Sequence, residues 1–422
     1  MIDVKALRDD PERFRKGAEQ KRESTDIDAA LELDRRRRDL LQEGNELKHQ
    51  RNVVSEEIGE MKKSGEDASD KIAAMRDVAD RIKSIDDELK EVEQELEQIL
   101  LTIPNPPREG VPVGVDESDN RLVREWGELP EFDFPLQNHM EIGDHLDLFD
   151  FQRSAKVSGT GFPLYTGMGA KLERALINFM VDYHVERHGY RELMPPFMVT
   201  RASMVNTGQL PKLAEDMYHV ESDDLYMIPT AEVPVTNLHA DEIIREDDLP
   251  IRYVGFTPCF RREAGSHGRE TRGFLRLHQF NKVEMVQFVK PSASYEVLET
   301  LTGHAEAILQ ALEIPYRVME LSTGDLSFAA AKCYDLEIWA PGEEKWLEVS
   351  SCSNFEDFQA RRGNIRYREN STRNVEYVHT LNGSGVATAR LLVSLLETHQ
   401  QEDGTVVLPE VLQPYFGAGI LK

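Results

Sequence analysis

Charged and aromatic residues alternate with apolar ones along the stretch from Gly273 to Met285. If this stretch is a β-strand, its period of two places on one face the residues Phe274, Arg276, His278, Phe280, Lys282 and Glu284. The opposite face is apolar and carries Leu275, Leu277, Val283 and Met285. An ordinary sheet with one solvated face has the same pattern, so this strand alone does not indicate a site.

A second charged segment, from Cys259 to Glu263, lies just upstream. There Arg261 and Glu263 share a face, and the polar loop 264–272 joins the two segments into a predicted hairpin. The common face of the hairpin then carries two arginines, two glutamates and an aromatic ring. Such a set suits a nucleotide, because guanidinium groups bind phosphates, a ring stacks on a base and a carboxylate accepts a hydrogen bond from an amine.

The first quarter of the chain has the pattern of long helices, since 27–101 contains no proline and is dense in charged residues and leucine. One column of the first half repeats every seven residues, at Leu33, Leu40, Leu47, Val54 and Met61. Two such columns fill the second half, at Met75, Ile82, Leu89, Leu96 and at Val78, Ile85, Val92, Ile99. Gly65 followed by an N-cap at Asp67 or Ser69 predicts a reversal between the halves, hence an antiparallel coiled-coil hairpin.

Four prolines between Ile103 and Pro112 cannot continue a helix and predict a linker. We therefore expect a helical hairpin domain at 1–103, a proline-rich linker at 104–120 and a second domain at 121–422. In the second domain, helices are predicted from Gly169 to His188 and from Ala387 to His399, and strands predominate after Pro250. Helices before and around antiparallel strands make the expected fold class α+β.

The chain has 422 residues, with 50 Lys and Arg against 77 Asp and Glu, so its formal net charge is −27. This acidity argues against a protein that coats nucleic acid through bulk charge, and any nucleic acid must meet a local basic patch. The acidic excess fits a saline habitat or simple solubility equally well. Apolar runs fall far short of the roughly 20 residues that a membrane helix needs. The N-terminus also lacks a secretory pattern, so we expect a cytoplasmic location and no membrane.

Histidine and cysteine spacing does not indicate a metal site. Cys259, Cys333 and Cys352 stand far apart and form no CxxC pair, which argues against zinc and against a disulfide framework. His184 and His188 are separated by one helical turn, and we interpret them as structural.

Several segments resemble the class II aminoacyl-tRNA synthetases, and among them the seryl-tRNA synthetases. The segment 260–266, Phe-Arg-Arg-Glu-Ala-Gly-Ser, with the strand through 279–284, resembles motif 2. The segments 169–196 and 381–390 resemble motif 1 and motif 3. The tripeptide Thr230-Ala231-Glu232 resembles the family's serine site, 348–351 its strand beside ATP, and the helical hairpin its tRNA-binding arm. The resemblance covers essentially the whole chain.

This resemblance implies a catalytic domain built on an antiparallel β-sheet flanked by helices, and a homodimer joined through motif 1. It implies ATP and L-serine as substrates, Mg²⁺ as cofactor, and tRNA(Ser) as acceptor, with tRNA(Sec) also charged where one exists. The serine carboxylate would attack the α-phosphate of ATP, and a ribose hydroxyl of tRNA would then take the seryl group.

Residue roles follow from the same resemblance. Arg261 would hold the α-phosphate, Arg390 would pack over adenine near the γ-phosphate, and Glu348 would help hold Mg²⁺, so these three are the expected catalytic residues. Glu263 would accept from the adenine amino group, and Phe280 would stack on the ring. The implied ATP site comprises Arg261, Arg262, Glu263, Phe280, Glu348, Val349, Ser350, Ser351 and Arg390. The implied serine site comprises Thr230, Ala231, Glu232, Arg276, Glu284 and Ser384, with Arg276 facing the substrate carboxylate.

The run Arg35, Arg36, Arg37 and Arg38 is the candidate basic patch for tRNA, although such a run is usually a solvated helix face. Two alternative functions stay open. One is an enzyme that passes the seryl group to another carrier, against which the intact arm argues. The other is a coiled-coil scaffold with an inactive catalytic fold, against which the full set of site residues argues.

Overall fold

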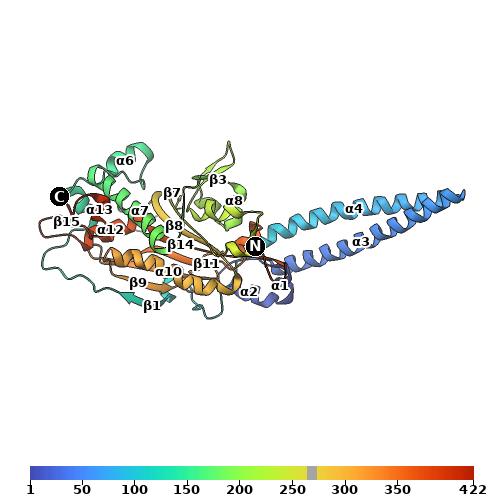
Figure 1. The fold of residues 1–422 in the computed structure, drawn as a ribbon, viewed down its shortest axis with the longest axis horizontal. Coiled ribbons are helices and arrows are strands. Elements are labelled where there is room, and N and C mark those ends of the chain that lie inside the picture. The colour runs from blue at the N-terminus through green and yellow to red at the C-terminus, as the bar shows by residue number, and fades with distance from the viewer. Residues whose placement is uncertain (264–272) are drawn as a thin grey trace. The chain divides into compact units, whose positions relative to one another are not determined.

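The computed structural model describes residues 1–263 and 273–422. They form two compact units, Met1–Pro104 and Asn105–Lys422 (Figure 1). The first is helical and the second combines helices with a mainly antiparallel sheet, so the predicted α+β class is confirmed. The loop 264–272, which includes the last three residues of the motif 2 segment, lies outside the described residues.

The first unit is a long helical hairpin with two short helices before it (Figure 1). Its helices are α1 (Val4–Asp9), α2 (Pro11–Gln20), α3 (Ile27–Ser64) and α4 (Ser69–Leu100). Gly65 ends α3 with a φ of +80°, and the Asp67 carboxylate accepts from the Ser69 amide at 2.9 Å. Gly65 thus ends α3 at the predicted reversal, but the predicted N-cap at Asp67 or Ser69 is wrong, because Ala68 occupies the N-cap position of α4. Leu40, Ile85 and Val92, all from the predicted seven-residue columns, form the buried contact between α3 and α4.

The second unit is built on an eight-stranded sheet in the order β1-β9-β10-β11-β14-β8-β7-β2. Its strands are β1 (Arg121–Trp126), β2 (Arg191–Leu193), β7 (Ile251–Phe260), β8 (Gln279–Val289), β9 (Tyr316–Glu320), β10 (Lys332–Ala340), β11 (Lys345–Asn354) and β14 (His379–Ala387). All neighbours pair antiparallel except β2, which runs parallel to β7. The main core lies between this sheet and helices α7, α10 and α12.

The remaining elements surround this sheet. The helices of the unit are α5 (His139–His145), α6 (Phe151–Ser158), α7 (Gly167–His188), α8 (Arg201–Thr207), α9 (Glu232–Thr236), α10 (Ser294–Ala311), α11 (Phe358–Arg362), α12 (Thr388–Thr398) and α13 (Gln413–Phe416). Small sheets are formed by β3 (Met198–Thr200), β4 (His219–Val220) and β5 (Leu225–Met227), by β6 (Ile243–Arg245), β12 (Arg366–Arg368) and β13 (Val375–Tyr377), and by β15 (Val406–Val407) with β16 (Ile420–Leu421). The two predicted helices correspond to α7 and α12 within two residues at each end.

The predicted hairpin exists as β7 and β8, but both strands are displaced from the predicted segments: β7 ends at Phe260, before Arg261 and Glu263, and β8 runs from Gln279 to Val289. The strand prediction for 273–278 is wrong: Gly273 has a φ of +61°, and the chain turns until β8 begins at Gln279. Phe274 therefore lies in the core rather than on the charged face, with its ring centre 4.6 Å from that of Phe149. From Gln279 onward the expected alternation holds, since Val283 and Met285 pack into the core.

Beyond the first unit, the proline-rich segment packs on the second one. The Asn105 amide donates to the carbonyls of Ala329 at 2.9 Å and Phe355 at 2.8 Å, and the Arg108 amide donates to the carbonyl of Ala331. Prolines lack donors, so Asn105 and Arg108 supply donors of the segment, while the Pro112 carbonyl accepts from the Thr323 amide at 2.8 Å.

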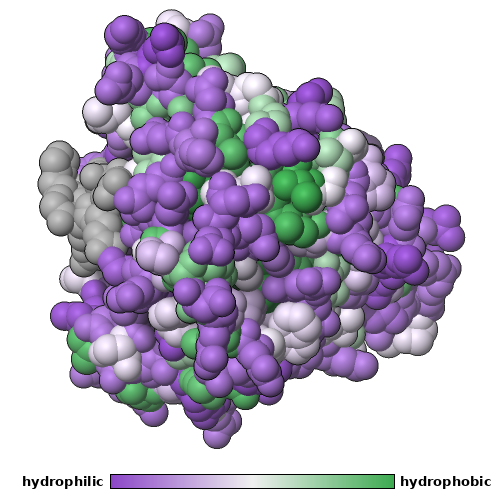
Figure 2. All heavy atoms as spheres, turned by 90° about the vertical axis from the view of Figure 1, so that its left-hand side faces the viewer, coloured by the Kyte–Doolittle hydropathy of each residue, from purple (hydrophilic) through white to green (hydrophobic). Residues whose placement is uncertain are grey.

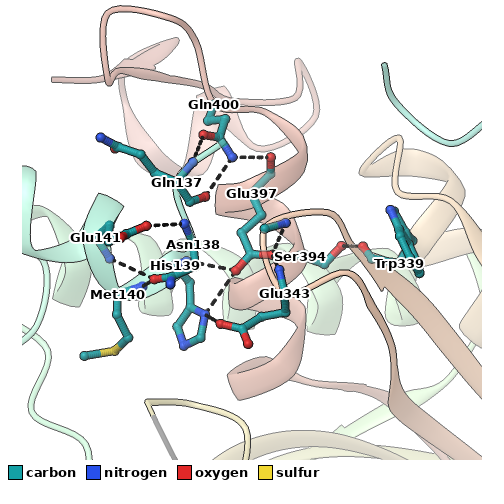
Figure 3. A network of polar contacts seen from close by, with 11 residues as sticks. Gln137, Asn138, His139, Met140, Glu141, Trp339, Glu343, Ser394, Glu397 and Gln400 are labelled. Atoms are coloured by element: carbon teal, nitrogen blue, oxygen red, sulfur yellow. Dashed lines mark hydrogen bonds and ion pairs between the residues drawn. The ribbon is translucent and has the colours of Figure 1, made fainter. Parts of the chain in front are cut away.

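A buried polar network fixes the C-terminal part of α12 (Figure 3). Both oxygens of the Glu397 carboxylate accept hydrogen bonds: one from the backbone amide of His139, and the other from those of Gly342 and Glu343. The His139 ring lies between the Glu397 and Glu343 carboxylates, 3.1 and 3.3 Å away. The network thereby ties α12 to the start of α5 and to the turn between β10 and β11.

The face of the second unit drawn in Figure 2 is mostly hydrophilic, with apolar residues in separate patches. None of the helices in the described ranges is both long and apolar enough to cross a membrane.

Candidate active site

A cavity of about 740 Å³ opens on the face of the sheet away from α7, α10 and α12. Most of the expected site residues line it: Thr230, Glu232, Arg261, Glu263, Arg276, Phe280, Glu284, Glu348, Val349, Ser351, Ser384 and Arg390. They come from β8, β11 and β14, from the start of α12 and from the segments that precede α9 and follow β7. Residues far apart in sequence thus meet in one cavity.

Three expected site residues are not among the described groups that line this cavity. Ala231 is fully buried in a neighbouring core cluster. Ser350 is buried and donates its hydroxyl to the Ser384 carbonyl at 2.6 Å, so it supports a lining residue. Arg262 is exposed, and its backbone amide donates to the Asp216 carbonyl.

Two buried carboxylates, Glu232 and Glu284, form one end of the cavity. Glu232 is the first residue of α9 and accepts from the Gln359 amide at 2.6 Å. Burial, and then the charge of Glu284, raise the pKa of Glu232 to about 7. Glu284 pairs with Lys282, which is two residues away and therefore on the same face of β8. A desolvated pocket with two acids and one lysine suits an ammonium ligand.

Hydroxyl groups complete this end of the cavity. Thr230 is buried, and its hydroxyl oxygen accepts from the Glu232 amide at 3.2 Å. Ser384 of β14 is the direct register partner of Glu284 across the β14–β8 ladder. The pocket can therefore offer hydrogen bonds to a ligand hydroxyl beside those to an ammonium.

The cavity is also lined by aromatic and cationic groups. The Arg261 guanidinium carbon lies 5.2 Å from the centre of the Phe280 ring. Arg261 follows the last residue of β7, and its amide donates to the His278 carbonyl, which extends the β7–β8 pairing by one step. Arg390 lies in the first turn of α12, and its guanidinium donates to the carbonyls of Leu275 and Glu348, at 3.1 and 2.9 Å.

Arg276 lies elsewhere than expected. It belongs to the turn before β8, not to the strand that carries Glu284, because the strand begins only at Gln279. Its Nε donates to the Glu263 carboxylate at 2.5 Å, and Glu263 itself has a φ of +52°. The structure thus pairs Arg276 with a residue of the expected ATP site.

Several residues that line or support the cavity were not predicted from the sequence. Lys282 lies on the predicted charged face of β8, so the alternation of side chains along this strand could have identified it as a cavity residue. Asp335 of β10 lines the cavity near Glu348, and burial together with the Glu348 charge raises its pKa well above the usual range. Gln359 supports Glu232 from α11. Neither Asp335 nor Gln359 stands in a recognisable local pattern.

The run Arg35 to Arg38 does not present unpaired cations. Arg35 pairs with Glu32 at 2.5 Å and Arg38 with Asp34 at 3.2 Å on the same helix, whereas Arg36 and Arg37 pair with Glu88 and Glu93 of α4. Near the tip of the hairpin, by contrast, exposed cations without an ion pair in the described part of the chain are Arg51, Lys62, Lys63 and Arg76.

Family comparisons match both units. Residues 1–107 match the seryl-tRNA synthetase N-terminal domain, and residues 218–399 match the class II tRNA synthetase core domain (G, H, P, S and T). A serine–tRNA ligase of Thermoanaerobacter pseudethanolicus is 55% identical over 422 residues, 100% of both chains, and one of Geobacter sulfurreducens is 54% identical over 99% of both. A solved seryl-tRNA synthetase of Pyrococcus horikoshii, complexed with ATP, has a TM-score of 0.93 and 39% identity, over 100% of this chain and 99% of that one. Because these similarities extend along its full length, the chain belongs to the seryl-tRNA synthetase family of class II aminoacyl-tRNA synthetases.

Proposed function

We propose that this chain activates L-serine with ATP and transfers the seryl group to tRNA(Ser). The observation that carries the proposal is one cavity that joins an acidic, hydroxyl-lined pocket to an aromatic and cationic end. The first end suits serine and the second suits ATP. Membership of the family along the full length supports the same reaction.

Serine recognition follows from the acidic end. The substrate ammonium pairs with Glu284 and Glu232, and its hydroxyl bonds to Thr230 or Ser384. Charge-assisted bonds to the ammonium are strong in a desolvated pocket. Alanine is rejected because the pocket groups that face the hydroxyl would stay unpaired.

Activation needs no protein nucleophile, since the substrate supplies one. A serine carboxylate oxygen bonds to the α-phosphorus of ATP, the bond from that phosphorus to the bridging oxygen breaks, and pyrophosphate leaves with the electron pair. Arg261 stabilises the charge that develops on the α-phosphate, while Phe280 and Arg390 hold the adenine between them. Catalysis then consists of positioning and charge stabilisation, as in phosphoryl transfer generally.

Glu348 and Asp335 fit a role in holding Mg²⁺. Two carboxylates face one cavity, and the raised pKa of Asp335 reflects both burial and the Glu348 charge, a repulsion that a divalent cation relieves. Both groups offer the oxygen ligands that this hard ion requires. When bound, Mg²⁺ supplies neutralisation of the phosphate charge.

To transfer the seryl group, this acidic protein must bind tRNA, which is a polyanion. We assign tRNA binding to the helical hairpin of residues 1–103, including Arg35 to Arg38. The guanidinium groups of these arginines have hydrogen-bond donors beyond those used in their ion pairs. A tRNA(Sec) is charged in the same way where one exists. The linker at 104–120 and the catalytic domain at 121–422 complete the proposed division.

A cytoplasmic homodimer is part of the proposal, with α7 and β2 at its interface. The strand β2 is an edge of the large sheet, and Met194 directly after it is 82% exposed. Unpaired sheet edges with exposed apolar residues favour association. Sedimentation of the purified protein tests the dimer, and a monomer at micromolar concentration would contradict it.

Aminoacylation tests the main proposal. Mixed tRNA is incubated with ATP, the protein and each of several labelled amino acids in turn. We expect only serine to be attached to tRNA. Pyrophosphate exchange that depends on serine, without any labelled tRNA, would instead support the alternative carrier. Absence of both reactions would support the inactive scaffold.

A further inference from the structure

One buried carboxylate outside the cavity connects three elements of the second unit. Glu173 lies in α7, and only 4% of its surface is exposed. Its Oε1 accepts a hydrogen bond from the Asn281 side-chain amide at 2.8 Å and lies 2.5 Å from the Thr388 hydroxyl, which donates to it. None of these three residues is among the described groups that line the cavity.

Both partners of Glu173 are neighbours of expected ATP-site residues. Asn281 follows Phe280 on β8, and because side chains alternate along a strand, Asn281 points toward α7 while Phe280 faces the cavity. Thr388 is the first residue of α12, two positions before Arg390. A single carboxylate oxygen therefore ties the strand that carries Phe280 to the helical turn that carries Arg390.

Glu173 is a buried acidic group among apolar side chains, so its two hydrogen bonds are important for the local structure. Burial raises the pKa of Glu173, as expected for a carboxyl group packed beside the apolar core residues Leu172 and Leu176. Burying such a group is costly unless its hydrogen bonds are used, and Oε1 accepts two of them, whereas Oε2 accepts none from the described residues. The first turn of α12 also has no side-chain cap, so a carboxylate beside Thr388 complements the positive end of the helix dipole.

We propose that Glu173 is a positioning residue, which sets the separation between the Phe280 ring and the Arg390 guanidinium and thereby the width of the adenine slot. This inference rests on the proposed function, in which these two groups enclose the adenine. Glu173 acts through Asn281 and Thr388 and touches no substrate.

Separate Michaelis constants for ATP and serine, measured by pyrophosphate exchange, test the inference. Glu173→Ala should raise the KM for ATP about tenfold or more, since small displacements of binding groups have large effects. The KM for serine should change less than about twofold, because the residues of the serine pocket are held by contacts that do not involve Glu173. Glu173→Gln should restore the ATP value, since its amide oxygen can accept both hydrogen bonds. Equal rises in both constants, or no rise for ATP in a folded variant, would overturn the inference.

Glu306→Ala is the matched control. Glu306 is also a buried carboxylate, 7% exposed, but it bonds to Arg124 and Tyr316 away from the cavity. It should lower the melting temperature and leave the KM for ATP unchanged. If Glu173→Ala does not fold, Thr388→Val removes the same contact from the other side and should raise the KM for ATP alone. An unchanged KM in Thr388→Val would then reject the inference.

Phe280→Leu separates failure of the inference from failure of the proposed function. If Phe280→Leu raises the KM for ATP and Glu173→Ala does not, only the positioning role is wrong. If Phe280→Leu leaves the KM for ATP unchanged, the adenine slot itself is wrong, and the inference falls with it. The double variant Glu173→Ala, Thr388→Val should be no worse for ATP than Glu173→Ala alone, because Glu173→Ala already removes the contact that Thr388→Val removes.

Discussion

Glu284 of β8 and Ser384 of β14 lie directly opposite each other in the antiparallel ladder at the centre of the large sheet. The carboxylate and the hydroxyl of the proposed serine pocket are therefore fixed by backbone pairing rather than by a loop. Both side chains are buried. A ligand that enters between them loses its water and must find partners on these two strands.

Glu284→Ala should weaken serine far more than ATP. The change leaves the substrate ammonium without a main carboxylate partner and leaves Lys282 unpaired in a closed pocket. Truncating one member of a buried charged pair costs about 2–5 kcal/mol. The KM values of both substrates in pyrophosphate exchange measure the effect. A variant in which ATP binding suffers and serine binding does not would mean that the pocket is assigned wrongly.

Arg261→Ala should lower kcat for adenylate formation by roughly 10²-fold or more, because it removes a contact made to charge that develops in the transition state. Its guanidinium lies over Phe280 at the cavity, so the fold should survive. Exchange kinetics are measured beside the thermal melt. Arg245→Ala, which changes a surface arginine of β6 with a 75% exposed side chain, is the control and should keep full activity. Near-normal exchange in folded Arg261→Ala would exclude the assigned role.

Serine binding should depend on pH through Glu232. The pKa of this carboxyl is raised from 4.5 to about 7, first by burial and then by Glu284. Because the ammonium needs the ionised form, the KM for serine should fall as pH rises from about 6 to about 8. Glu232→Gln should show a higher KM that is flat over this range. An unchanged pH profile in the variant would assign the titration to another group.

The same raised pKa has a consequence for stability. The folded protein holds the Glu232 proton more tightly than the unfolded chain, so this group favours folding most at low pH and loses that contribution as pH rises from 4.5 toward about 7. The Glu232→Gln variant lacks this dependence. The melting temperature of the parent protein should therefore fall relative to that of the variant as pH rises across this window. Above about pH 7 the comparison should favour the variant.

Local pattern predicted much of this architecture and site. The seven-residue columns located α3 and α4, Gly65 and Asp67 located their reversal, and alternation along β8 placed Phe280 with Glu284. The strand prediction for 273–278 failed because alternation continues through a turn that Gly273 begins with a positive φ.

Contacts between distant segments account for what was missed. Gln359 reaches Glu232 across 127 positions, and Asp335 meets Glu348 only because β10 and β11 pair. A run of four arginines indicates positive charge, yet Glu88 and Glu93 of α4 compensate two of them. Such pairings depend on how elements pack and leave no signal within either segment.

Removal of the outer hairpin should separate the two chemical steps. A Cβ added at Gly44 would lie 3.4 Å from Ile85, so α3 and α4 are adjacent there and a short glycine-rich turn can replace 45–84. Asp34, which is buried and bonded to Arg8 and Arg38, is retained in this design. Serine-dependent pyrophosphate exchange should stay close to normal, whereas charging of tRNA should fall by at least about tenfold, because the shortened protein keeps Arg35 to Arg38 but loses the contacts of the outer arm with tRNA. Full charging efficiency in the shortened protein would show that the outer arm, residues 45–84, is not needed to bind tRNA.

Salt dependence should show which cations of the hairpin bind tRNA. Arg35, Arg36, Arg37 and Arg38 are each held in an ion pair, and two of these pairs join α3 to α4. If these arginines also contact phosphates, replacing them with glutamine should lower the slope of log K for tRNA binding against log salt concentration. The expected decrease is about 0.9 for each lost contact, the value for a nucleic-acid duplex, which we use as an approximation for tRNA. Loss of the exposed ion pairs of Arg35, Arg36 and Arg37 should cost only about 0–1 kcal/mol each in stability. The partner of Arg38 is the buried Asp34, which keeps its ion pair with Arg8 in this variant. We expect a flatter slope in this variant and a melting temperature close to that of the parent protein.

The tip provides the matched comparison. Replacing Lys62, Lys63 and Arg76 with glutamine removes exposed cations that have no ion pair in the described residues, so their loss disturbs no packing. Affinity for tRNA is measured at several salt concentrations for both variants. A flatter slope for the tip variant with an unchanged slope for the arginine variant would mean that the arginines serve the hairpin itself and that tRNA is held at its tip. A flatter slope for the arginine variant supports the assignment, because a merely solvated helix face releases no counterions when tRNA binds.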